Sequence, residues 1–178
     1  TVALLSKGID AFAAWDPWPI VALRDVPGAV EIIRGGDVIS YLGFNVTTRA
    51  WAANNGPTIV KVLAGLSEAD QWMRKNPQRA AQVATRWVPG LKQEVAEAAM
   101  EFNIQQADRR LSANNYRALW SAQDRLHRLG FLKETFDVNK HIDASHILKV
   151  MADHPALFND LPPIPAAAAL TPGFSFKP

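Results

Sequence analysis

The pattern of hydrophobic and polar positions divides the chain into a region of short apolar runs and a region with helical spacing. Three apolar runs are bounded by glycine, proline or aspartate: residues 9–14, 29–33 and 39–47. Runs of this length predict buried strands. Between the first two, Asp16 is suited to the N-cap and Pro17 to the first position of a helix that reaches about Leu23. The first region therefore predicts strand–helix–strand–strand.

From about residue 49 onward, apolar residues recur three and four positions apart, which indicates amphipathic helices. One helix is predicted over residues 57–75, and Pro77 opens the next, which ends at Gly90. Further helices are predicted at residues 95–102, around residues 116–126 before Gly130, and at residues 143–151. The fold class predicted from the pattern is thus α/β with a helix-rich second half.

The two ends of the chain do not continue the pattern of strands and amphipathic helices. Residues 1–8, "TVALLSKG", predict the last turns of a helix with Gly8 at the C′ position. After Pro155 the chain is rich in proline and alanine, and we expect an extended or disordered tail. The predicted division is residues 1–48, the helical residues 49–153 and the tail 154–178.

Composition narrows the function classes. The 178 residues carry a formal net charge of +2 and show no dense lysine and arginine stripe, so nucleic acid is not a predicted partner. No apolar run is long enough to span a bilayer, and the first residues do not form a signal-peptide pattern. The absence of cysteine excludes disulfides and thiolate chemistry within this chain.

The sequence contains no recognisable catalytic or metal motif. The four histidines are scattered without metal-ligand spacing, and we interpret them as surface or helix-end residues: His127, His141, His146 and His154. There is no G-x-S-x-G element around any serine, and "RGGD" at residues 34–37 is interpreted as a plain turn. We therefore predict no catalytic residue, no metal and no cofactor.

The segment "WDPWP" is the strongest candidate site. It lies where a predicted strand meets a helix, and ligands of open α/β sheets bind at such junctions. Pro17 and Pro19 have no N–H, so this helix start is a poor site for a bare anion. A carboxylate at Asp16 beside Trp15 and Trp18 suits a cationic or hydroxyl group, or an aromatic or alkyl body. An N-cap with two packing tryptophans remains the alternative interpretation.

These residues resemble a known family. "DAFAAWDP" at residues 10–17, followed by "YLGFNVTTRAWAANNG", "IVKVLAGLSEADQWMRKNP" and "AAQVATRW", is similar to the C-terminal portion of periplasmic solute-binding proteins. The group concerned serves importers of aliphatic sulfonates, taurine and nitrate. The resemblance covers roughly residues 1–153, and its sharpest motif is residues 10–17.

The resemblance implies a two-lobe, type II periplasmic-binding-protein fold with the ligand in the cleft between the lobes. Trp15 and Asp16 would line the cleft together with Trp18, and Tyr41 and Asn45 would approach it from a crossover strand. The implied partners are a small-molecule ligand, a membrane permease of an ABC importer and a first lobe that we expect to lie outside this chain. The implied location is periplasmic or extracytoplasmic.

Three functional hypotheses follow. The favoured one is a solute-binding component of an importer without catalysis. The second is an enzyme on the same fold, similar to sulfinate desulfinases or to synthases of a pyrimidine precursor; the former resemble cysteine-dependent enzymes. The third is a helical interaction domain without a small ligand.

Overall fold

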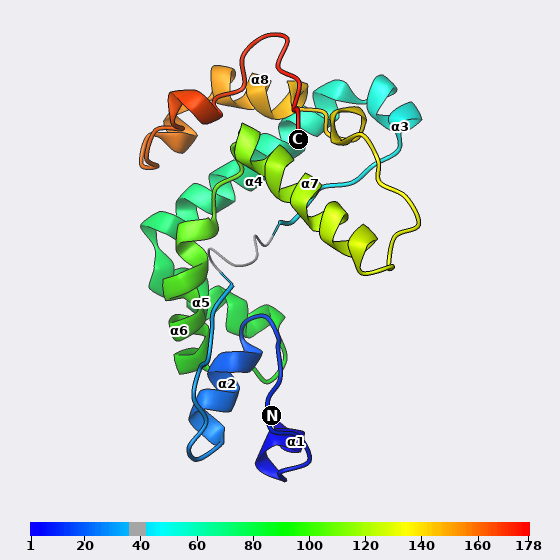
Figure 1. Ribbon diagram of the computed structural model, residues 1–178. Coiled ribbons are helices and arrows are strands. Elements are labelled where there is room, and N and C mark those ends of the chain that lie inside the picture. Colours follow the sequence, from blue (N-terminus) through cyan, green and yellow to red (C-terminus); the bar gives the residue numbers. More distant parts are fainter. Residues whose placement is uncertain (36–41) are drawn as a thin grey trace. The chain divides into compact units, whose positions relative to one another are not determined.

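The computed structural model describes residues 1–35 and 42–178, and the chain forms two compact units (Figure 1). One unit comprises Thr1–Gly35 and Asp70–Ala107, and the other comprises the described residues of Gly36–Ala69 together with Asp108–Pro178. The three-part division predicted from the sequence stays a prediction.

The first unit is built from helices with small buried side chains. Its elements are α1 (Val2–Leu5), α2 (Trp18–Asp25), the last residues of α4 (Gly56–Lys75), α5 (Pro77–Trp87), α6 (Gln93–Asn103) and the 3-10 turn η1 (Ile104–Gln106). Helix α6 packs against both α5 and α2 (Figure 1). The apolar side chains buried in this unit are few and mostly short: Ile20, Ala22, Ala80, Ala81, Val95 and Ala96.

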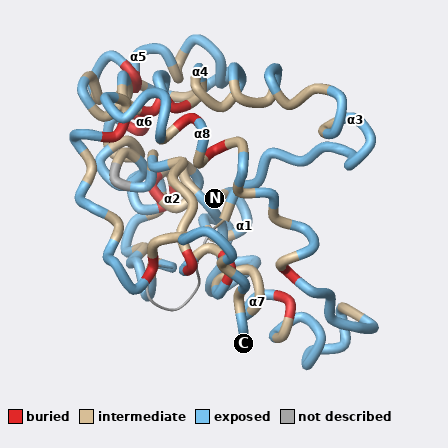
Figure 2. The backbone as a smooth tube through the Cα atoms, turned by 90° about the horizontal axis from the view of Figure 1, so that it is seen from above, coloured by how far each residue is buried: buried red, intermediate tan, exposed pale blue. Residues whose placement is uncertain are grey.

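The second unit contains the remaining helices. They are α3 (Arg49–Asn54), the first part of α4, α7 (Ala113–Arg128), η2 (Val138–Lys140), α8 (Ser145–Asp153), η3 (Pro155–Phe158) and η4 (Ala166–Ala168). Its core centres on Ile147, Val150 and Phe158, against which α4 contributes Val60 and Leu63. Figure 2 colours the backbone by burial, and the buried residues of α8 are Ile147 and Val150.

The helix predictions are confirmed in their order and approximate bounds. Helix α4 corresponds to the predicted residues 57–75, and α5 begins at Pro77 as expected. Helices α6, α7 and α8 correspond to the three later predictions. The amphipathic pattern of these segments is strong enough to specify helices without tertiary information.

The strand predictions are wrong for the residues that the structure describes, since residues 1–35 and 42–178 contain no strand. Residues 9–14 and 29–33 are irregular, and the predicted strand 39–47 lies partly outside the described residues. A strand is stabilised by a ladder with a neighbouring strand, and the described chain offers none to these segments. Val30, Ile32 and Ile33 accordingly remain exposed rather than buried. The structure is helix-rich, and the α/β lobe stays a prediction.

Two predicted helix ends also differ. At the end of α1, Lys7 rather than Gly8 takes the left-handed conformation, with φ of 57°. The N–H of Lys7 donates to the Leu4 carbonyl and the N–H of Gly8 to the Ala3 carbonyl, which is a Schellman motif. Lys7 therefore occupies the C′ position predicted for Gly8, and Gly8 occupies the C″ position after it. Helix α2 begins at Trp18 with Pro17 as its N-cap and without a side-chain cap. Asp16 is therefore not the cap that the sequence predicted.

The tail, for which we expect an extended or disordered chain, is irregular with two 3-10 turns and contacts the rest of the second unit. Phe158 belongs to the core of the second unit, and the Phe174 ring packs edge-on against Tyr116 of α7 with 5.1 Å between centroids. The backbone N–H of Phe176 donates to the Asn139 side chain at 2.7 Å, and its carbonyl accepts from the same amide at 3.0 Å. Aromatic burial and these paired hydrogen bonds hold a proline-rich segment that its composition alone would leave loose.

The packing of the second unit generates a stability prediction. Val150 is fully buried in α8, so Val150→Ala removes two buried methyl groups and leaves a cavity. We expect a loss of about 2 kcal/mol in the free energy of unfolding, measured by urea denaturation. The matched control is Val46→Ala, which truncates an exposed valine of the same unit. Equal unfolding midpoints for the two variants would contradict this core assignment.

Candidate functional site

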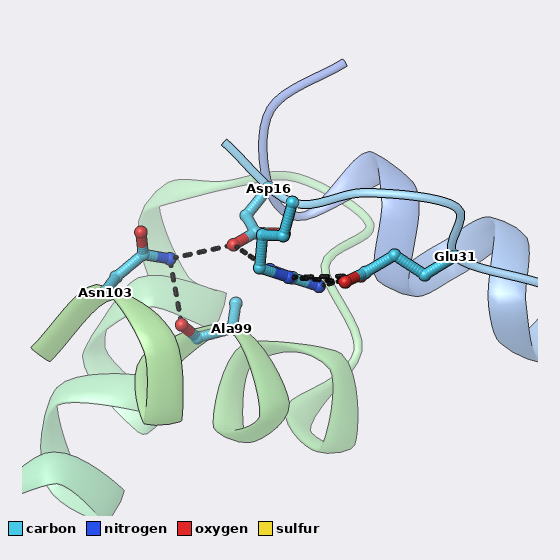
Figure 3. Close-up of polar contacts among 5 residues, drawn as sticks. Asp16, Glu31, Ala99 and Asn103 are labelled. Atoms are coloured by element: carbon cyan, nitrogen blue, oxygen red, sulfur yellow. Dashed lines mark hydrogen bonds and ion pairs between the residues drawn. The ribbon is translucent and has the colours of Figure 1, made fainter. Parts of the chain in front are cut away.

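Asp16 is the centre of a polar cluster in the first unit (Figure 3). Because helix α2 begins without a side-chain cap, the carboxylate is free to turn toward other groups. Its Oδ2 atom accepts from Nη1 of Arg34 at 3.3 Å and lies 3.5 Å from Nδ2 of Asn103. The two donors come from segments 18 and 87 positions away along the chain. The Asp16 carboxylate, predicted to cap the helix, instead accepts hydrogen bonds from residues distant in the sequence.

Arg34 is held more tightly by Glu31 than by Asp16. Its Nε donates to both carboxylate oxygens of Glu31 at 3.1 Å, and Nη2 lies 2.5 Å from Oε2 of the same residue. This is a two-pronged pairing along one edge of the guanidinium. The hydrogen bond to Arg34 lowers the pKa of Glu31 below its ordinary value, against a smaller opposing effect of burial. The hydrogen bond to Glu31 raises the pKa of Arg34.

Helix α6 contributes the other side of the cluster. The guanidinium carbon of Arg34 lies 3.9 Å from the centroid of the Phe102 ring, which is cation–π distance. The next residue, Asn103, also donates to the Ala99 carbonyl at 2.8 Å, so its amide is anchored to its own helix. The aromatic face and the amide therefore position Arg34 and Asp16 from the same helix end.

The second carboxylate oxygen of Asp16 has no such partner. Oδ1 is buried, and no hydrogen bond to it is formed within the described part of the chain. The side chain as a whole is 14% exposed. A buried acceptor left unsatisfied typically costs about 1–3 kcal/mol. Native structures keep few such groups, and those that remain call for an explanation such as a role in binding.

The structure places the predicted site residues as follows. Trp15 and Trp18 flank the Asp16–Pro17 turn, with exposed fractions of 70% and 55%, so neither is the packing residue of the alternative interpretation. Asn45 is exposed and belongs to the other unit. Tyr41 lies outside the described residues. Their assignment to one ligand site stays a prediction.

Sequence reasoning missed four residues of the cluster: Glu31, Arg34, Phe102 and Asn103. An acid and a base three positions apart are neighbours on a helix, but Glu31 and Arg34 lie in an irregular segment, so their spacing gives no signal. The sequence pattern indicates only a plain turn at residues 34–37. Nothing in the sequence could have indicated that Phe102 and Asn103 meet Asp16, because that proximity depends on how α6 packs.

The second unit contains a serine, a histidine and an aspartate close together at the start of α8: Ser145, His146 and Asp143. They do not form a catalytic triad. The Ser145 hydroxyl donates to Oδ1 of Asp143 at 2.6 Å, and the Ser145 N–H donates to the same oxygen at 2.9 Å. These two bonds hold the pKa of Asp143 below its usual value. A hydroxyl that donates to a carboxylate two residues earlier makes a local side-chain turn before α8 and is not an activated nucleophile.

Two further findings concern metals and membranes. Within residues 1–35 and 42–178, no three histidine or acidic side chains gather closely enough to hold a metal ion. In the same ranges, every helix is too short or too polar to cross a bilayer.

Comparison with known proteins gives one informative similarity. A stretch of 79 residues is 36% identical to a protein of Escherichia coli (strain K12) named "Putative aliphatic sulfonates-binding protein". The match covers 44% of this chain and 24% of that protein, so the matched stretch spans about a quarter of its relative's length. No family model and no solved structure matches the chain. The printed name of that relative describes a binding protein.

The pairing of Glu31 with Arg34 generates a pH prediction. Because the folded-state pKa of Glu31 is depressed, its contribution to stability is present above the unfolded value of about 4.5 and is lost as pH falls through the folded-state pKa. The Glu31 side chain is 37% exposed, so solvent screening limits the contribution to about 0.5 kcal/mol. Glu31→Gln should therefore be less stable than the parent at pH 7 by this amount.

The measurement is urea unfolding of both proteins between pH 3 and pH 7. The difference between parent and Glu31→Gln should shrink as pH falls below the unfolded value of about 4.5, because protonation of Glu31 removes the ion pair. The control is Glu94→Gln, which removes the acid of an exposed pair with Arg24 in the same unit. A difference that stays constant down to pH 3 would show that the ion pair does not contribute.

Proposed function

We propose that this chain is part of the solute-binding component of an ABC importer and that it binds a small sulfonate- or taurine-like organic ligand. The observation that carries the proposal is the pair of exposed indoles flanking a carboxylate with a buried, unsatisfied oxygen. Large exposed aromatic residues beside a polar group are typical of binding surfaces rather than of ordinary protein exterior. The similarity to a sulfonates-binding protein supports the same role.

In this proposal the ligand's parts are divided between chemically different residues. Trp15 and Trp18 cover the carbon body of the ligand and lie near its cationic group, because indole faces attract both apolar groups and cations. Asp16 turns its carboxylate outward and accepts a hydrogen bond from an ammonium or hydroxyl group. The sulfonate is held by groups other than the start of α2, since Pro17 and Pro19 remove two N–H donors there.

The wider setting is proposed by resemblance. The ligand lies in a cleft between this lobe and a first lobe, and Tyr41 and Asn45 approach it from the crossover. The loaded protein delivers the ligand to a membrane permease from the periplasm or an equivalent extracytoplasmic space. No reaction is assigned to the site.

Calorimetric titration of the intact protein tests the proposal. Taurine, alkanesulfonates, nitrate and a pyrimidine are compared, with tryptophan fluorescence as a second readout. We expect binding of taurine or an alkanesulfonate and a fluorescence change on binding. Trp15→Ala should weaken that binding by about tenfold, because one covering ring is lost.

The matched control is Trp87→Ala, which removes an exposed tryptophan at the end of α5. It should leave the affinity unchanged. Equal affinity of Trp15→Ala and the control would exclude Trp15 from the site. No heat and no fluorescence change with any sulfonate would contradict the proposed ligand class.

A further inference from the structure

We infer that Glu31 sets the charge selectivity of the site at Asp16, so that the site favours a sulfonate bearing an ammonium group over the same sulfonate without one. The inference rests on the proposed function, in which Asp16 contacts the ligand. Glu31 does not itself touch the ligand in this account. It acts by occupying Arg34, the nearest cation to Asp16 among the ion pairs of the cluster.

The guanidinium of Arg34 would otherwise be a strong anion receptor. Its Nε–Nη2 edge is the fork that binds carboxylates and sulfonates through two parallel hydrogen bonds. Glu31 occupies this edge through Nε and Nη2, and Asp16 takes Nη1. Phe102 covers one face of the plane at 3.9 Å. An incoming anion must therefore displace a carboxylate before it can form a two-pronged bond with Arg34.

The net charge of the cluster follows from its members. Asp16 and Glu31 contribute two negative charges and Arg34 one positive charge, which leaves a single negative charge. Asn103, the other hydrogen-bonding side chain, is neutral. A site with one excess negative charge attracts an ammonium group and repels a bare anion.

The Asp16 carboxylate has one oxygen that the rest of the cluster does not satisfy. Arg34 and Asn103 both approach Oδ2, which leaves Oδ1 as the acceptor without a partner among the described residues. A buried acceptor bonds most strongly to a charged donor, because that bond replaces the lost hydration of the oxygen. Because Oδ1 is buried, the carboxylate must turn outward to receive a ligand. An ammonium group then gives Oδ1 the donor that it lacks, whereas ethanesulfonate offers no donor to it.

The test compares taurine with ethanesulfonate, which differ by the amino group, on the intact protein. We expect the parent to bind taurine more tightly. Glu31→Gln keeps the shape of the side chain but removes its charge, so Arg34 becomes available to anions and the cluster becomes neutral. The ratio of ethanesulfonate to taurine dissociation constants should fall by about fivefold, through both weaker taurine and tighter ethanesulfonate binding.

The matched control is Glu94→Gln, which should leave the ratio unchanged, since Glu94 pairs with Arg24 and not with the cluster. Asp16→Asn should bring the ratio close to one, because the ammonium loses its charged acceptor. Without any substitution, raising salt from about 0.05 M to 0.5 M should shrink the parent's preference, since the charges are partly exposed and therefore screened. A gain in ethanesulfonate affinity is a result that mere structural damage does not produce.

The outcomes separate the two proposals. If the parent binds both sulfonates equally, or if Glu31→Gln keeps the parent's ratio, the inference about Glu31 is overturned while the proposed sulfonate-binding role stands. If the parent binds neither sulfonate, both are overturned. A lower ratio in Glu31→Gln together with an unchanged ratio in Glu94→Gln supports the inference.

Discussion

The packing of α6 against α2 and α5 is the constraint on which the candidate site depends. The buried residues at these contacts are mostly alanine, which lets the helices approach closely. Helix α2 begins at Trp18, two residues after Asp16, and the last turn of α6 carries Phe102 and Asn103. Burial of small apolar side chains therefore brings together polar groups that are far apart in the sequence.

The cluster around Asp16 contains more negative than positive charge, and this excess determines which ligands it favours. One guanidinium is shared by two carboxylates, so neither the arginine nor the start of α2 is an open receptor for anions. The exposed tryptophans on either side of Asp16 add apolar surface next to a negative group. Together these features fit a ligand with a carbon body and a cationic or donor group, which is a narrower class than anions in general.

The helices were predictable because the residues that specify a helix lie close together in the sequence. Apolar residues at helical spacing, Pro77 at a helix start and Gly130 after α7 specify the helices wherever they pack. The strand segments were not predictable in this way. An apolar run such as residues 29–33 becomes a strand only when a neighbouring strand completes its hydrogen bonds, and periodicity carries no information about that neighbour.

The sequence by itself determined the order of the helices, the unusual composition of "WDPWP" and the weakness of that helix start as an anion site, because these depend on residue type and near neighbours. Only the tertiary structure decided what Asp16 does. Its carboxylate turns from the predicted cap to Arg34 and Asn103, a choice between local and distant donors that is settled by the position of α6. The structure likewise anchored the tail, through the contact of Phe174 with Tyr116. Burial and long-range pairing decide such outcomes, and no short stretch of sequence encodes them.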